Sequence, residues 1–149
     1  MLLNLLTGLP VMLLCLLLQA IFVTLCLRYY VRHRLAQHDR GVWSWDFLLL
    51  SMVMLLMLLG NLVQISIWAA LFMLLGEFAD FNTALYHSGV NFAGLGYGDI
   101  VMSERWRMLG PLEAANGILM FGLSTAVMTA AVMDVLKANR ARLEKDEER

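Results

Sequence analysis

Glycine occupies every second position from 94 to 98, in the run GLGYGD that ends at Asp99. Glycine adopts backbone angles that residues with a side chain resist, so such a strip can turn successive carbonyl oxygens to one side. The strip follows NTALYHSGVNFA, a candidate helix of about ten to twelve residues with Asp80 or Asn82 as its N-cap. The negative end of that helix dipole and its unpaired carbonyls favour a cation. The chemistry predicted here is therefore the binding of a cation by the backbone.

Three stretches without a charged residue are long enough to cross a bilayer, at 1–27, 47–76 and 114–133. A helix needs about 20 apolar residues to cross about 30 Å of hydrocarbon. A fourth uncharged stretch, 81–98, is rich in glycine and asparagine and should not span. Non-helical backbone at membrane depth is tolerated only where protein buries it or where it lines a watery path. We therefore expect 77–113 to contain a re-entrant loop.

The composition excludes other classes of protein. The 149 residues are 60% hydrophobic and 15% charged, with a formal net charge of -1, unlike a soluble domain, a disordered chain or a protein that binds nucleic acid through bulk positive charge. Cys15 and Cys26 lie in one apolar run and no Cys/His cluster has ligand spacing, so neither a disulfide framework nor a structural metal site is supported. No catalytic triad or phosphate-binding loop occurs, and we predict that the chain is not an enzyme and needs no cofactor.

The charges predict an orientation. Four arginines lie in the loop 28–46 and five Lys and Arg in the tail 137–149, whereas 77–113 has two arginines beside five acidic residues. The positive-inside rule then places loop and tail in the cytoplasm and the N-terminus outside. Because the arginines follow the first apolar run instead of preceding it, 1–27 is interpreted as a retained helix and not a signal peptide. We expect a multi-pass protein of the plasma membrane, surrounded by lipid.

The segment FNTALYHSGVNFAGLGYGDI resembles the pore helix and selectivity filter of the potassium channel family, whose signature is Thr-Val-Gly-Tyr-Gly followed by Asp. GILMFGLSTAVMTA is similar to the pore-lining inner helix of that family, with Gly117 at the hinge position. The resemblance implies a pore module at 47–136, with outer helix 47–76, pore helix 81–93, filter 94–99 and inner helix 111–136. It also implies a homotetramer, in which each chain has three identical subunits as partners. The expected fold is thus an all-α membrane protein: three transmembrane helices, a pore helix and a filter loop.

The resemblance assigns roles to individual residues. Tyr86 and Asp99 are expected to support the filter through a hydrogen bond, because Val90 stands where some relatives have a carboxylate. The family has threonine at position 94, and the hydroxyl of that threonine is missing from the innermost ion site here. Five backbone carbonyls would coordinate K⁺, those of Gly94, Leu95, Gly96, Tyr97 and Gly98.

Steps of three or four along the third span bring a set of residues onto one helix face. We assign this face to the pore; in the alternative, its threonines bond to carbonyls of their own helix. Gly117 is either a hinge or a packing position. The cavity-lining residues on this face are Ile118, Phe121, Thr125 and Thr129, with Met133 and Asp134 at the inner mouth.

Four polar residues within the apolar segments have a structural interpretation. Gln19, Asn61 and Gln64 are expected to form hydrogen bonds between helices. His87 on the pore helix is interpreted as a structural polar contact, with pH sensing as the alternative. The first helix is expected to pack peripherally against the second span.

The function predicted from these observations is passive conduction of potassium ions through a tetrameric pore. A weakly selective cation channel is an alternative because of Gly94. A non-conducting membrane adaptor that keeps the pore fold is another. A subunit of a potassium uptake system fits less well, because such systems usually carry four repeats in one long chain. No span carries periodic arginines, so a voltage sensor is not expected.

Overall fold

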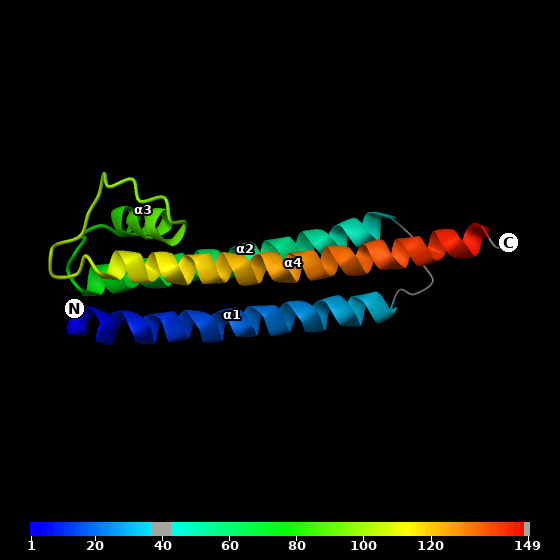
Figure 1. Ribbon diagram of the computed structural model, residues 1–149, viewed down its shortest axis with the longest axis horizontal. Coiled ribbons are helices and arrows are strands. Elements are labelled where there is room, and N and C mark those ends of the chain that lie inside the picture. Colours follow the sequence, from blue (N-terminus) through cyan, green and yellow to red (C-terminus); the bar gives the residue numbers. More distant parts are fainter. Residues whose placement is uncertain (37–42, 148–149) are drawn as a thin grey trace.

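The computed structural model describes residues 1–36 and 43–147, and within these ranges the chain forms four helices and no strand. They are α1 (Leu2–Ala36), α2 (Trp43–Leu74), α3 (Phe81–Phe92) and α4 (Leu109–Glu147). Helices α1, α2 and α4 run lengthwise beside one another, and the short α3 lies against one end of this bundle (Figure 1). The N-terminus lies at the same end as α3, and the C-terminus lies at the opposite end.

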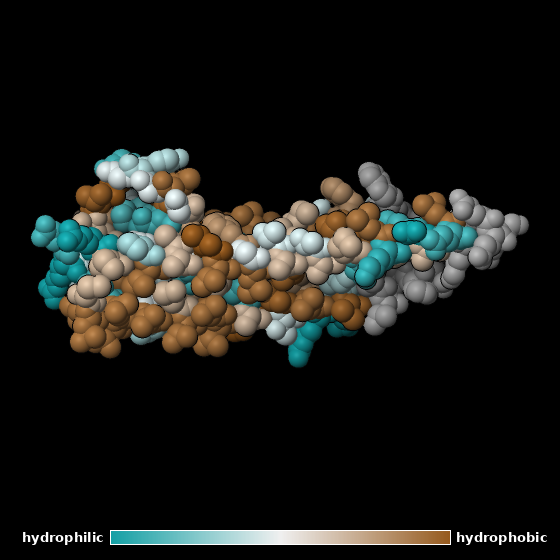
Figure 2. All heavy atoms as spheres, in the orientation of Figure 1, coloured by the Kyte–Doolittle hydropathy of each residue, from teal (hydrophilic) through white to brown (hydrophobic). Residues whose placement is uncertain are grey.

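The three long helices have the dimensions of membrane spans. The segments Leu2–His33, Ser44–Leu74 and Leu109–Ala141 are each apolar and long enough to cross a bilayer. The 12 residues of α3 extend only about 18 Å, too short to cross. Figure 2 shows a largely hydrophobic surface along the middle of the bundle, with hydrophilic residues towards both ends. The predicted all-α membrane fold with a short helix between the second and third spans is confirmed.

The helices extend beyond the predicted spans. Helix α1 continues past residue 27 to Ala36, and α2 begins at Trp43 instead of residue 47. Helix α4 runs from Leu109 to Glu147, so the charged tail KANRARLEKDEER continues the inner helix as far as that residue, as its sequence predicts. The first charged residue marks where hydrocarbon ends, but Arg, Lys and Glu are good helix formers and an established helix adds residues readily. The predicted loop 28–46 is therefore helical at both of its ends. Its centre, 37–42, and the end of the tail, 148–149, lie outside the described residues.

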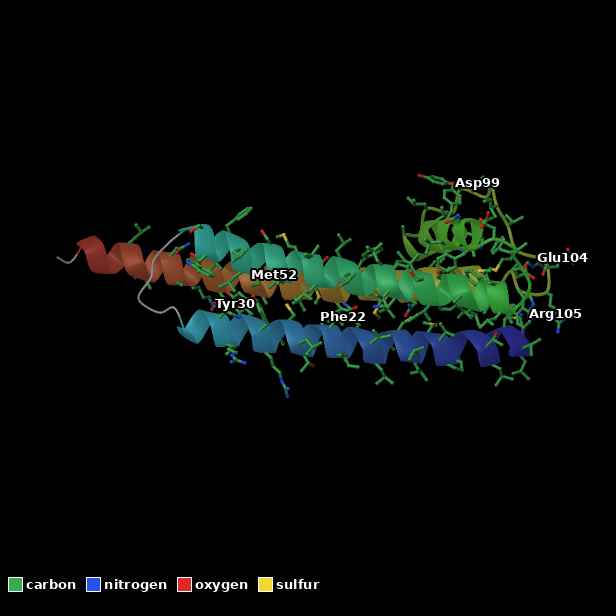
Figure 3. All side chains as sticks on the ribbon, turned by 180° about the vertical axis from the view of Figure 1, so that it is seen from behind. Phe22, Tyr30, Met52, Asp99, Glu104 and Arg105 are labelled. Atoms are coloured by element: carbon green, nitrogen blue, oxygen red, sulfur yellow. The ribbon has the colours of Figure 1, made fainter. Side chains whose placement is uncertain are left out.

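Helix α1 packs against both α2 and α4, on the side of the bundle away from α3 (Figures 1 and 3). The sequence predicted a contact with the second span; the contact with α4 is additional. Figure 3 shows Tyr30 between α1 and the other long helices, and its hydroxyl donates to Asp134 Oδ2 of α4 at 2.7 Å. The buried apolar side chains of the bundle form two clusters. The cluster near α3 includes Cys15, Trp68, Phe72, Phe92, Leu109 and Met120, and the second cluster includes Cys26, Tyr30, Leu49, Val53, Met57 and Ala131.

A polar network crosses the middle of the bundle. Gln64 Nε2 donates to Gln19 Oε1 at 2.7 Å, and Gln19 Nε2 donates to Ser124 Oγ at 3.1 Å. Asn61 Nδ2 also donates to Ser124 Oγ, at 3.4 Å. The predicted hydrogen bonds between helices are confirmed, and Ser124 is a partner that the sequence did not indicate. Each such bond contributes on the order of 1 kcal/mol within a membrane.

Candidate functional site in the re-entrant segment

Helix α3 begins with a polar cap. Asp80 has extended backbone angles, and its Oδ2 accepts from the backbone N–H of Thr83 at 2.9 Å. Of the two N-caps predicted, the structure thus has Asp80. The segment that follows the strip is hydrogen-bonded to the residues just before α3. Both the N–H and the hydroxyl of Ser103 donate to the Glu77 carboxylate at 2.6 Å. The two ends of the re-entrant segment are therefore tied together at the end of the bundle.

Helix α3 ends at Phe92, and Gly94 closes its C-terminus in a glycine cap. The N–H of Leu95 donates to Val90 O at 2.9 Å, and the N–H of Gly94 donates to Asn91 O at 2.8 Å. This pair of bonds is the Schellman pattern, in which the residue after the cap is left-handed and usually glycine. Gly94 has a φ of 71°, as the pattern requires. The glycine that replaces the threonine of the potassium channel signature is therefore the residue that terminates α3.

In the strip that follows, residues with a positive φ alternate with residues whose φ is negative. Gly94, Gly96 and Gly98 have φ values of 71°, 59° and 73°, whereas no described residue other than glycine has a positive φ. Leu95 and Tyr97 therefore lie between left-handed neighbours. Their side chains are 55% and 65% exposed, so this chain alone does not bury the strip. The sequence prediction of glycines placed for unusual angles is confirmed, and ion coordination stays a prediction.

A cavity of about 330 Å³ lies between the strip and the start of α4. The three glycines of the strip line it together with His87, Arg107 and Pro111, among other residues. The strip therefore has an open space on one side within the single chain.

Tyr86 and Asp99 form the hydrogen bond that the sequence predicted. The Tyr86 hydroxyl donates to Asp99 Oδ2 at 2.7 Å. Figure 3 shows Asp99 at the edge of the molecule beside α3. The bond favours the carboxylate and the protonated phenol, so it lowers the pKa of Asp99 and raises the pKa of Tyr86. It joins the middle of α3 to the end of the strip.

His87 is buried and makes two polar contacts in an aromatic site. Its Nδ1 lies 3.0 Å from Ile100 O, and its Nε2 lies 2.9 Å from Asn91 Nδ2. Because a carbonyl can only accept, Nδ1 carries the proton and Nε2 accepts from the amide. The ring packs against Phe72 and Phe78, and burial lowers the pKa of His87. The predicted structural contact is confirmed, and pH sensing stays a prediction.

The predicted pore face of α4 is uncovered in the single chain. Ile118 is 65% exposed, Phe121 40% and Met133 49%, and the side chains of Thr125, Thr129 and Asp134 are exposed as well. Asp134 nevertheless accepts the hydrogen bond from Tyr30 described above. Phe121 also packs edge-on against Phe92 of α3, with 5.5 Å between the ring centroids. Most of the face is nevertheless exposed in the single chain, and the lining of a cavity stays a prediction.

Gly117 is a site of close helix contact. A Cβ atom at this position would lie 1.9 Å from Phe92 O and 2.7 Å from Phe92 C. The end of α3 thus rests directly on α4. The geometry supports the packing alternative for Gly117, and its role as a hinge stays a prediction.

Glu113 and Ser88 form a buried contact that the sequence interpretation missed. The Ser88 hydroxyl donates to Ile65 O at 2.7 Å and also forms a hydrogen bond with the Glu113 carboxyl group. Both side chains are fully buried. In the sequence, Glu113 lies near the start of the third span, where an acidic residue is already explained by the positive end of the helix dipole. Its three-residue spacing from Asn116, which places two polar residues on one helix face, is the signal that could have revealed the contact.

The comparisons with known proteins support one family. A family model described as "Ion channel", for pore modules of two transmembrane helices, matches residues 60–134, half of the chain. The match covers the second half of α2, all of α3, the glycine strip and α4 as far as Asp134. No curated protein and no solved structure matches the chain.

Proposed function

Because the chain belongs to this ion channel family, we propose that it conducts potassium ions passively through a pore formed by four identical subunits. The observation that carries the proposal is the alternation of positive φ at Gly94, Gly96 and Gly98 directly after the C-terminus of α3. Backbone carbonyls of such a strip can replace the water shell of K⁺. Gly94 to Gly98 supply these carbonyls in our proposal, and the Tyr86–Asp99 bond braces them.

Two exposed surfaces support the tetramer. The strip exposes Leu95 and Tyr97, and α4 exposes Ile118 and Phe121. One strip forms one wall of a pore, so conduction requires further copies arranged around an axis. In this assembly Thr125 and Thr129 line the cavity, and Met133 and Asp134 lie at its inner mouth.

The proposed orientation places the α3 end of the bundle outside the plasma membrane and the α4 tail in the cytoplasm. The segment 77–113 carries a net charge of -3 in sequence. An acidic mouth of this kind concentrates cations and raises their rate of entry.

The test is ion flux into liposomes that contain the purified full chain. We expect K⁺ flux without Na⁺ flux from the wild type, and loss of flux or of K⁺ preference in Gly96→Ala. The matched control is Gly89→Ala: an added Cβ meets no atom within 4 Å at either position, but only Gly96 has a positive φ, of 59°. The control should therefore conduct as the wild type does.

A weakly selective cation channel is the second candidate, and Gly94 favours it. This residue brings no hydroxyl to the innermost site, and its backbone N–H is taken up by the cap of α3. Equal K⁺ and Na⁺ flux would support this candidate. Absence of flux would support a non-conducting adaptor, and a chain that is monomeric or dimeric in lipid nanodiscs would overturn the fourfold pore.

A further inference from the structure

A second polar site lies behind α3, away from the strip. It consists of Trp68, Ser88, Glu113 and Asn116, and we call it the buried polar cluster. None of these four side chains is accessible to solvent within the single chain. Cys15 of α1, which is also fully buried, lies beside it.

The contacts bring these residues from three helices to one place. Ser88 of α3 bonds to Ile65 O and to the Glu113 carboxyl group. Trp68 lies three residues after Ile65 on α2, and Asn116 lies three residues after Glu113 on α4, so each pair shares a helix face. The Cys15 thiol is a neighbour of Trp68, Glu113 and Asn116, which closes the cluster from the side of α1.

Four polar atoms of this cluster make no hydrogen bond to a nitrogen or oxygen atom among the described residues. They are Trp68 Nε1, Glu113 Oε2 and both amide atoms of Asn116. Only two other buried side-chain atoms in the described ranges share this state, Asn4 Oδ1 and Gln64 Oε1. Buried polar atoms in folded proteins are almost always paired with protein or ordered water. The concentration of four in one cluster therefore points to a bound molecule.

The donor and acceptor character of the four atoms indicates which molecule binds there. Two are N–H donors, on Trp68 and Asn116, and two are oxygens, on Glu113 and Asn116. A cation would be repelled by the N–H groups and an anion by the carboxyl oxygen. Water accepts two hydrogen bonds and donates two, and buried waters typically make about three bonds to otherwise unpaired groups.

We propose that the buried polar cluster binds at least one water molecule, which links α2 to α4 behind the pore helix. Together with the Ser88–Glu113 bond, this water holds α3 in position against α2 and α4. The proposal does not depend on which ion passes through the pore, because it concerns only the packing behind α3.

The direct test is a high-resolution structure of the full chain in lipid nanodiscs. We expect density for water within hydrogen-bonding distance of the Asn116 amide and of Trp68 Nε1 or Glu113 Oε2. A map without this density, in which Asn116 pairs directly with Trp68 or Glu113, would overturn the proposal.

Thermal unfolding provides a second test that does not involve flux. Trp68→Phe and Asn116→Leu each remove a partner of the water while keeping most of the volume, and each should lower the melting temperature by about 2 to 4 °C. The double variant should lose no more than the worse single variant, because one water serves both side chains. Fully additive losses would overturn the proposal. Trp45→Phe and Asn82→Leu are matched controls at exposed positions and should leave the melting temperature unchanged.

Discussion

Replacing Gly117 by alanine tests the contact between α3 and α4. Both alternatives for this glycine, hinge and packing position, come from the sequence, and they predict different results. The added Cβ would lie 1.9 Å from the carbonyl oxygen of Phe92, and ordinary van der Waals contact begins at 3.4 Å. The helices would have to separate by about 1.5 Å, the difference between these distances. Because the obstacle is backbone and not a flexible side chain, the end of α3 itself must move.

The stability lost through the clash with Phe92 is expected to exceed the stability gained through the helix propensity of alanine. Overpacking a well-packed site costs about 1–3 kcal/mol, and occasionally more. Alanine recovers about 1 kcal/mol relative to glycine inside a helix. Phe92 lies two residues before Gly94, so the movement of α3 would be transmitted to the start of the strip. The net loss of stability is up to about 2 kcal/mol, so we expect Gly117→Ala to lower the melting temperature by up to about 8 °C and to abolish K⁺-selective flux.

The assay compares Gly117→Ala with Gly122→Ala in thermal unfolding and in liposome flux. Gly122 lies in the same helix, and a Cβ there would meet no atom within 4 Å. This control should be as stable as the wild type or more stable, by up to about 1 kcal/mol, since it gains helix propensity without a clash. Its flux should be unchanged.

Two results would refute the reasoning. If Gly117→Ala were as stable and as selective as Gly122→Ala, the close contact with Phe92 would not exist in the membrane. If Gly117→Ala kept its stability and K⁺ preference but conducted more slowly, the hinge interpretation would be correct and the packing interpretation wrong.

Three further predictions concern α3 and the glycine strip that follows it. Tyr86→Phe should reduce K⁺ selectivity as much as Asp99→Ala does, and the double variant should be no worse, because each change removes the same hydrogen bond; additive losses in flux assays would show that the bond is not shared. Gly94→Thr restores the residue of the potassium channel signature, yet it should destabilise the chain by about 1–2 kcal/mol, because threonine must adopt a φ of 71°; a melting temperature at or above that of the wild type would contradict this. Burial lowers the pKa of His87 in the folded state, so the neutral side chain is the form that the fold accommodates. The contribution of His87 to the free energy of unfolding should therefore be complete above the unfolded pKa of 6.5 and be lost as the pH falls below that value. Melting temperatures between pH 7.5 and 5 should therefore fall less in His87→Gln than in the wild type or in the control His33→Gln, and equal slopes would exclude His87 as the cause.

The sequence predicted the elements that composition and local geometry determine. Apolar runs of sufficient length identified the three long helices, and glycines at alternate positions identified the strip. The ends of the helices were predicted less well, because a charged residue such as Arg28 ends an apolar run without ending a helix. The backbone continues as long as each residue can add a helical hydrogen bond.

Contacts between distant segments were predictable only where a residue type has few suitable partners. Asp99 needed a donor and Tyr86 was the aromatic donor placed to reach it, so their bond followed from the sequence. Glu113 has a local explanation at its helix start, and its spacing from Asn116 indicates a polar face without identifying Ser88 as the partner. Its environment depends on how α3 rests on α2 and α4, which neither periodicity nor composition encodes.

Two demands on position 94 conflict, and Gly94 meets only one of them. A threonine here would offer a side-chain hydroxyl to an ion, but a β-branched residue strongly resists the left-handed angles that end a helix in the Schellman pattern. Glycine accepts those angles, and the N–H groups of Gly94 and Leu95 then satisfy the carbonyls of Asn91 and Val90. Carbonyls paired in this way carry less free negative charge towards the strip than unpaired ones would. In the proposed pore, glycine at position 94 would therefore weaken the innermost ion site twice, through the missing hydroxyl and through the capped end of α3. We predict that any loss of K⁺ preference originates at that site.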